Sequence, residues 1–138
     1  MKRFVLDCSM TMAWCLEDEA SPRADAVLAS LESQEAIVPS HWPLEVANVL
    51  TICERKGRLS ASRISQILRL LGGLAIDIDD QTAKRALGDV LSLARAHRLT
   101  AYDAAYVELA LRTGCPLASL DAELNASATG LGIALFDG

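Results

Sequence analysis

Short apolar runs alternate along this chain with longer segments whose apolar residues recur at helical spacing. Five runs have the length of strands: residues 3–7, 36–38, 74–78, 117–120 and 133–136. Between them, apolar positions recur at i, i+3, i+4 and i+7, as in Val46, Val49, Leu50 and Cys53. This alternation predicts an α/β fold with a mostly parallel, five-stranded sheet flanked by helices on both faces.

Local signals place the helices between these strands. Ser9 and Ser60 are suitable N-caps, Pro22 suits a first helical position, and Gly57, Gly72 and Gly114 follow helix ends. Four helices are expected at residues 9–17, 43–56, 82–97 and 102–113. A further helix begins at 21–22, another is capped by Ser60 and ends near 72, and a short helix or loop is expected around 122–128. With 138 residues, we expect one domain spanning 1–138.

Four acidic residues occupy comparable places in this pattern. Asp7 and Asp121 end strand-like runs, and Glu45 and Asp103 open helical segments. Ligands of parallel α/β sheets bind beyond the carboxyl ends of the strands, and helix starts often face the same edge. We therefore expect the four carboxylates to converge, although they are far apart in sequence.

Clustered carboxylates are typical ligands of hard divalent cations such as Mg²⁺ or Mn²⁺. Such an ion lowers the pKa of a bound water and stabilises charge in phosphodiester hydrolysis, with no need for a nucleophilic side chain. The chain has two histidines and no G-x-S-x-G, which disfavours a Ser–His–Asp enzyme. Metal-dependent phosphodiester chemistry is the function that the four acids favour.

Each acid also has a structural interpretation. Asp7, Asp103 and Asp121 can cap helices or turns, and Glu45 can be a first-turn acid beside the helix dipole. Three polar neighbours are weaker candidates for a supporting role at the site: Ser9, Asn48 and Ser119. The denser cluster of Asp77, Asp79 and Asp80 is expected at a strand exit and helix cap, Trp14 and Trp42 in the core, and His41 in a loop.

The net charge of −5 at first disfavours a nucleic-acid partner, but its distribution changes that view. Without the four candidate acids, 14 acids oppose 13 bases, and a bound cation offsets the site's own charge. Arg55, Lys56, Arg58, Arg63 and Arg69 lie close in sequence and either form solvated helix faces or contact phosphates.

The four cysteines have no metal-binding spacing, and they are expected to be free thiols in a reducing compartment. No stretch has the length of a signal peptide's apolar region or of a membrane span. We therefore expect a cytoplasmic protein with no membrane partner.

The segments around the acids carry a family likeness. FVLDCS at residues 4–9, PLEVANVL at 43–50, LTAYDAAYVELA at 99–110 and LASLD at 117–121 resemble the four acidic motifs of PIN-domain ribonucleases, in order and over nearly the whole chain. The compact length is similar to that of VapC toxins of toxin–antitoxin pairs. Ser119 stands where threonine is frequent, and Cys8 where a small residue is usual; neither departure removes an acid.

This resemblance implies a PIN-like domain that cleaves RNA with Mg²⁺ or Mn²⁺, with Asp7, Glu45, Asp103 and Asp121 as catalytic and metal-binding residues. It also implies a homodimer, a cognate VapB-type antitoxin and a structured substrate such as tRNA or ribosomal RNA. Two alternatives remain: a PIN-like module that binds RNA or protein without cutting, and a housekeeping PIN nuclease. An aspartyl-phosphate enzyme is disfavoured because Asp7-Cys8-Ser9 lacks the second acid of a D-x-D.

Overall fold

A parallel sheet lies at the centre of the structure, a computed structural model that describes residues 2–138. Its strands are β1 (Arg3–Leu6), β2 (Glu35–Val38), β3 (Ile76–Ile78) and β4 (Leu117–Ala118), in the order β3-β2-β1-β4. All three neighbouring pairs run parallel. The predicted α/β class with a parallel sheet is therefore confirmed.

The sheet has four strands where the sequence predicts five. The run at residues 133–136 forms a single parallel bridge, between Leu135 and Leu117, flanked by two backbone hydrogen bonds of Leu117 to Ala134 and Phe136. Because β4 has only two residues, it offers too short an edge for a full fifth strand. Phe136 instead packs by stacking its ring on Phe4 of β1, with centroids 4.3 Å apart.

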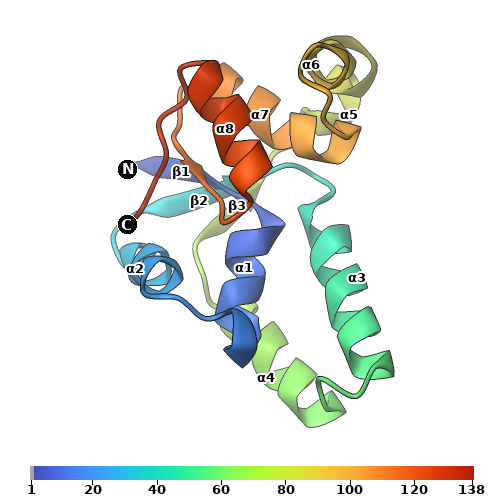
Figure 1. The fold of residues 1–138 in the computed structure, drawn as a ribbon. Coiled ribbons are helices and arrows are strands. Elements are labelled where there is room, and N and C mark those ends of the chain that lie inside the picture. Colours follow the sequence, from blue (N-terminus) through green and yellow to red (C-terminus); the bar gives the residue numbers. More distant parts are fainter. Residues whose placement is uncertain (1) are drawn as a thin grey trace.

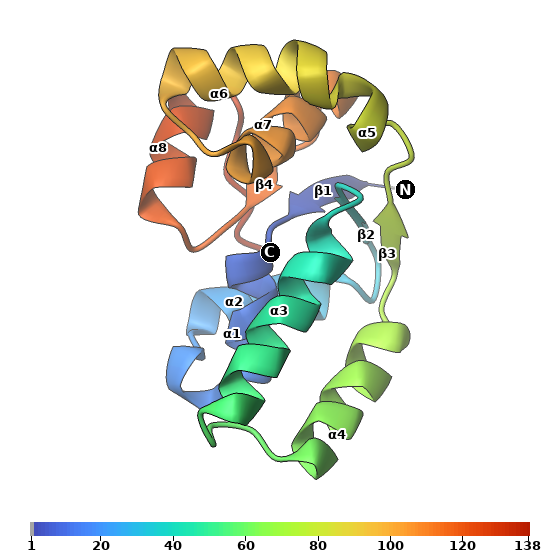
Figure 2. The ribbon, with the colours of Figure 1, turned by 90° about the vertical axis from the view of Figure 1, so that its right-hand side faces the viewer.

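Helices cover both faces of the sheet, as predicted (Figure 1). One side carries α1 (Cys8–Cys15), α2 (Pro22–Ser30), α3 (Trp42–Arg55) and α4 (Ala61–Gly72), and the other carries α5 (Thr82–Arg85), α6 (Leu91–His97), α7 (Ala101–Thr113) and α8 (Ala122–Gly130). A short 3₁₀ turn, η1 (Glu17–Glu19), follows α1. Figure 2 shows α3 and α4 extending from the sheet as a helical hairpin.

The predicted helix over 82–97 has the right extent but is interrupted. Its middle, η2 (Ala86–Val90), has π-type hydrogen bonding, and Gly88 departs from helical geometry with φ −112° and ψ −105°. Glycine tolerates this conformation because it lacks a Cβ. Leu87, beside the break, is 88% exposed.

The core surrounds α7 and β1. Phe4, Val5 and Leu6 are fully buried, and every residue from 104 to 110 is buried as well. Both tryptophans are in the core as expected, and Trp42 Nε1 donates a hydrogen bond to Thr11 Oγ1, which ties the start of α3 to α1. All four cysteines are free thiols. Among the helices of residues 2–138, none combines the length and apolarity required to cross a bilayer.

A buried ion network joins α7 to the end of β3. Arg112 donates two hydrogen bonds to Asp79, at 3.1 and 2.7 Å, and also bonds Glu108, with the shortest distance at 2.8 Å. Asp79 is 8% exposed and also accepts a bond from Thr82, so it anchors α7 rather than capping α5. The bidentate guanidinium bond lowers the pKa of Asp79 against the opposing effect of burial.

Replacing Arg112 tests the contribution of this network. Arg112→Met leaves the buried Asp79 carboxylate without its cation and leaves Glu108 with Arg85 alone, at 3.6 Å. The free energy of unfolding should therefore fall by roughly 3 kcal/mol or more in denaturant titrations. The matched control is Arg23→Met, which removes an ion pair with the exposed Asp137 and should cost about 0–1 kcal/mol. Equal, small losses in both variants would contradict a stabilising role for the network.

Candidate functional site

The fold places the four acids as the sequence predicts, at strand ends and helix starts. Asp7 follows β1 and Asp121 follows β4, and these strands are parallel neighbours, so both carboxylates leave the same edge of the sheet. Glu45 lies in the first turn of α3 and Asp103 in the first turn of α7. The bond between Trp42 and Thr11 fixes the start of α3 beside α1 and therefore brings Glu45 toward Asp7.

Asp7 is buried, with 4% exposure, and is held by three donors. Its Oδ1 accepts hydrogen bonds from Ser9 Oγ at 2.7 Å and from the backbone N–H of Met10 at 3.0 Å. Its Oδ2 accepts a bond from Ser119 Oγ at 2.6 Å. The capping interpretation of Asp7 is thus correct, and the same side chain also joins β1 to β4.

Ser9 and Ser119 extend this network to Asp121. Ser9 Oγ accepts a bond from the backbone N–H of Leu120 at 2.9 Å, and Ser119 Oγ accepts one from the N–H of Asp121 at 3.0 Å. Each serine hydroxyl therefore donates a hydrogen bond to Asp7 and accepts one from a backbone N–H in the segment after β4. The structure gives both serines a role in positioning Asp7 and the segment that carries Asp121.

Asp121 and Asp103 differ in how they are held. Asp121 caps α8, because its Oδ1 accepts bonds from the N–H groups of Glu123 and Leu124. The cap of α7 is Thr100, whose side chain accepts from the N–H of Asp103, so the Asp103 carboxylate is not the cap. Within residues 2–138, the Asp103 carboxylate makes no hydrogen bond to another protein group, which leaves it available to a ligand.

Glu45 is held by two residues that the sequence reasoning missed. Its Oε1 accepts a hydrogen bond from the Tyr106 hydroxyl and lies 3.2 Å from His41 Nε2. His41 Nε2 is also 3.0 Å from the carbonyl oxygen of Tyr102. Both of these neighbours are acceptors, so Nε2 carries the proton and donates.

The sequence did contain signals for these contacts. His41 lies in a loop, as expected, and its i, i+4 spacing to Glu45 places the two side chains together. Tyr106 follows Asp103 by three positions on the same helix face. In contrast, Asn48 is exposed and makes no hydrogen bond to Glu45 in the described part of the chain, so nothing here supports the predicted orienting role.

The acids perturb one another electrostatically. The pKa of Asp7 is raised to about 6, mainly by burial and to a smaller extent by the charge of Asp121, against the hydrogen bonds from Ser119, Met10 and Ser9. The pKa of Asp103 is also raised, first by burial and then by the charges of Asp121 and Glu45. The four carboxylates therefore share one region of negative potential.

This region suits a hard cation, although the acids stand too far apart to surround an ion without water ligands. Carboxylate oxygens are the donors that Mg²⁺ and Mn²⁺ prefer. A cation would stabilise the ionised forms of Asp7 and Asp103, which burial and the neighbouring acids disfavour. Among residues 2–138, no three His, Cys, Asp or Glu side chains stand close enough together to hold a metal ion. Mg²⁺ commonly binds through one or two carboxylates and keeps several waters, so the open spacing fits a water-completed site.

Sequence comparison finds relatives over nearly the whole chain. A family model described as the PIN domain matches residues 4–129. Ribonuclease VapC3 from Pyrobaculum aerophilum is 32% identical over 122 residues, which are 88% of this chain and 92% of that protein.

Solved structures share the fold. PAE2754 from Pyrobaculum aerophilum matches with a TM-score of 0.69 and 24% identity, over 94% of this chain and 88% of that chain. VapC20 from Mycobacterium tuberculosis, a toxin that cleaves the sarcin–ricin loop, has a TM-score of 0.62 and 12% identity, over 98% of this chain and 99% of that chain. FitAcB from Neisseria gonorrhoeae has a TM-score of 0.57 and 20% identity, over 96% of each chain.

The raised pKa of Asp7 leads to a stability prediction. The folded state holds this proton more tightly than the unfolded chain, so ionisation costs stability as pH rises from about 4 to about 6, and the full cost applies above pH 6. Without divalent metal, Asp7→Asn should therefore raise the free energy of unfolding at pH 7.5 by roughly 1–3 kcal/mol. The gain should shrink as pH falls toward 4.

Urea titrations of wild type and variant across this pH range, in EDTA, make the measurement. Glu32→Gln, which neutralises an exposed acid, is the control and should show no comparable gain. A stabilisation by Asp7→Asn that does not vary with pH, or a loss of stability at pH 7.5, would contradict the electrostatic cost assigned to Asp7.

Proposed function

We propose a function from the premise that this chain belongs to the PIN-domain family. The chain is a VapC-type toxin, an endoribonuclease that hydrolyses RNA phosphodiester bonds with Mg²⁺ or Mn²⁺. One observation carries the proposal: the four acids that match the family's motifs lie at the same edge of the sheet. Burial raises the pKa of Asp7 and of Asp103 there, and the charges of neighbouring acids in the set add to both shifts. The name and extent of the VapC3 relative support the same activity.

Asp7, Glu45, Asp103 and Asp121 would hold the ion, directly or through water. A bound divalent ion supplies a water of lowered pKa and stabilises charge on the phosphate. The chain's own part is to fix the carboxylates in place before substrate arrives. Ser9 and Ser119 hold Asp7, and Tyr106 and His41 hold one oxygen of Glu45.

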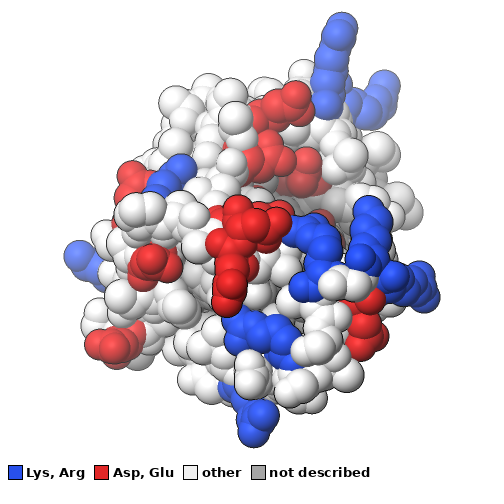
Figure 3. Space-filling model, turned by 60° about the horizontal axis from the view of Figure 1, so that its bottom comes forward, with Lys and Arg blue, Asp and Glu red and all other residues white. Residues whose placement is uncertain are grey.

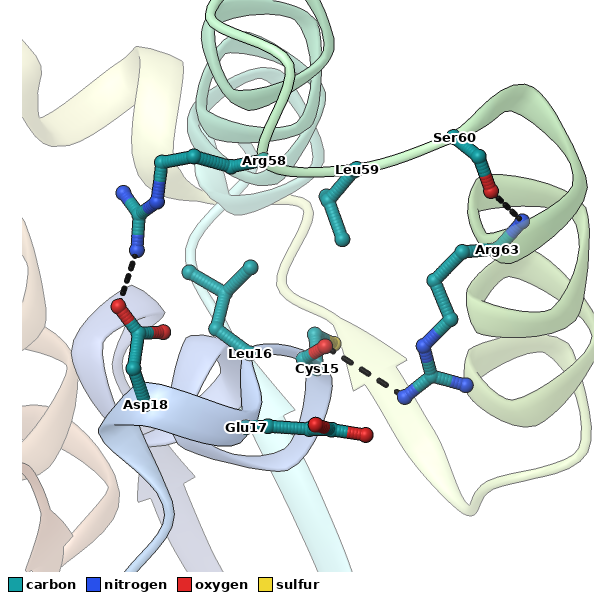
Figure 4. Close-up of a pocket in the computed structure, with 8 residues that line it drawn as sticks. All are labelled: Cys15, Leu16, Glu17, Asp18, Arg58, Leu59, Ser60 and Arg63. Carbon is teal, nitrogen blue, oxygen red and sulfur yellow. Dashed lines mark hydrogen bonds and ion pairs between the residues drawn. The ribbon is translucent and has the colours of Figure 1, made fainter.

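The distribution of basic residues supports an RNA substrate. Residues 55–63 contain four bases and no acid, and they span the end of α3, the turn and the start of α4. Figure 3 shows Lys and Arg side chains gathered on the lower face of the molecule, beside an acidic patch. Two of the bases are already engaged across a pocket: Arg58 binds Asp18 at 2.7 Å and Arg63 lies 3.5 Å from the Cys15 carbonyl oxygen (Figure 4). Arg55 and Lys56 therefore remain for phosphate contact.

Metal-dependent RNA cleavage is the direct test. Purified protein should cleave RNA with Mg²⁺ or Mn²⁺ and stop when EDTA is added. Asp7→Asn and Asp103→Asn should each lower the cleavage rate by about 100-fold or more, because each removes a charge that faces the ion. Asp89→Asn, at an exposed acid in η2, is the matched control and should cleave normally. Full activity in both site variants would refute the assignment.

The open spacing of the acids favours one alternative, a PIN-like module that binds RNA or protein without cutting. Calorimetric titration with Mn²⁺ separates the two functions. Heat of binding that is lost in Asp103→Asn supports the nuclease, whereas no binding in the wild type supports the module.

We also propose that the chain forms a homodimer and binds a VapB-type antitoxin. An apolar groove of about 400 Å³ runs between α3, α4 and β3, with Val46, Leu50, Leu68 and Ile78 among its lining residues. Leu68 and Ile78 line the same groove and are both half exposed, so the groove presents large apolar side chains to solvent. The groove suits the apolar face of a partner helix.

Co-expression tests the antitoxin partner. Expression in a bacterial host should slow growth, and a small neighbouring reading frame should restore growth and co-purify with the chain. Leu68→Asp should weaken co-purification, whereas Leu87→Asp, at an exposed leucine outside the groove, should not. If no neighbouring gene suppresses toxicity, or no toxicity appears, the toxin role is refuted. The nuclease role is then decided separately by the cleavage assay.

A further inference from the structure

A small apolar pocket lies beside Glu45 and Asp103. It has a volume of about 190 Å³ and lies between the turn before α3, the α5–η2 segment and the start of α7. Four alanines and Val90 form its walls, and His41 and Tyr102 contribute aromatic rings. None of these residues is among the four acids, so the pocket is a distinct feature next to the candidate metal site.

The pocket is joined to the acids by covalent and hydrogen-bonded links. Tyr102 immediately precedes Asp103, and its carbonyl oxygen accepts from His41 Nε2. The same His41 nitrogen is 3.2 Å from Glu45 Oε1. A ligand in the pocket would therefore contact residues that directly adjoin two of the four acids.

Tyr102 presents an aromatic ring to solvent at the mouth of this pocket. It is 64% exposed, whereas Tyr106, one turn later on the same helix, is buried. Its ring lies 5.7 Å from the His41 ring with an interplanar angle of 50°, so the two rings form an open corner at the pocket. Exposed aromatic faces of this kind stack on unpaired nucleobases.

The size and polarity of the pocket narrow the class of ligand. Its volume is below the roughly 300–1,000 Å³ typical of sites for drug-sized ligands, which favours one flat ring system. The nearby polar group Thr82 Oγ1 is already bonded to Asp79 and to the N–H of Ser40. The pocket therefore offers mainly stacking and apolar contact rather than recognition of the base edge.

We propose that this pocket holds an unpaired nucleobase of the RNA, next to the scissile phosphate, with Tyr102 as the stacking surface. The proposal rests on the nuclease function proposed above. It implies that cleavage requires an unpaired nucleotide beside the cut, because a base within a duplex cannot leave its stack to enter the pocket without a cost.

Fluorescence binding tests the pocket without relying on cleavage. The probe is a short single-stranded RNA with one fluorescent purine analogue, titrated with the full chain in EDTA. Stacking should change the fluorescence saturably. Tyr102→Ala should weaken binding by roughly 5- to 150-fold, the range expected for one base–aromatic stack. Tyr102→Phe should bind like wild type because the ring is kept, and Leu87→Ala is the exposed control outside the pocket.

Cleavage kinetics provide a second readout in Mg²⁺. Tyr102→Ala should raise KM and lose any preference for the base beside the cut. Tyr102→Phe should keep the KM and the base preference of the wild type. Unchanged probe binding in Tyr102→Ala overturns the pocket proposal, even if metal-dependent cleavage is normal. A variant that loses only antitoxin binding or dimerisation also overturns it, since the pocket would then hold protein. Failure of the wild type to cleave any RNA with metal would instead refute the proposed function.

Discussion

The buried carboxylate of Asp7 is the constraint on which the site depends. A carboxylate at this depth costs free energy unless donors or a cation compensate it. Ser9, Met10 and Ser119 compensate it in part, and in doing so they join the end of β1, the start of α1 and the end of β4. One polar group thereby sets the edge of the sheet at which Asp121 emerges. The remaining cost is the physical reason to expect a cation there.

The opposite half of the site depends on α7, the helix at the centre of the core. Asp103 lies in its first turn, and Tyr106 reaches across to hold Glu45 of α3. Arg112, near the other end of α7, is bound to Asp79 after β3. The helix that carries one acid thus positions a second acid and is itself fixed to the sheet. Core packing and site geometry are therefore set by the same element.

Much of this arrangement could be predicted from local patterns. The sequence pattern predicted strand ends and helix starts at Asp7, Glu45, Asp103 and Asp121. Because parallel strands present their carboxyl ends to one edge of the sheet, it also predicted that these acids lie at that edge. Ser9 and Ser119 were identified as neighbours of the acids, but only the structure shows that both bond Asp7. The contacts of His41 and Tyr106 with Glu45 join segments that only the tertiary fold brings together, so residue spacing gave only an indirect signal.

The errors also have physical causes. The run at 133–136 has the composition of a strand, yet the two-residue β4 cannot pair with its full length. The segment 82–97 has helical periodicity, but Gly88 breaks its backbone, and Leu87 beside the break is exposed. The cluster of Asp77, Asp79 and Asp80 was expected at a strand exit and helix cap, but the pairing of Asp79 with Arg112 depends on a residue far away in sequence. The short edge strand and the pairing of Asp79 both concern contacts between segments that are far apart in sequence, which local patterns do not encode.

The location of a bound ion tests the central claim most directly. Crystals soaked in Mn²⁺ give an anomalous signal that locates the metal independently of any activity. If the four acids form one metal centre, the signal lies among Asp7, Glu45, Asp103 and Asp121, with oxygen ligands at distances typical of a hard cation. A signal elsewhere in the chain, or none at this edge of the sheet at saturating Mn²⁺, would contradict a metal centre formed by these residues.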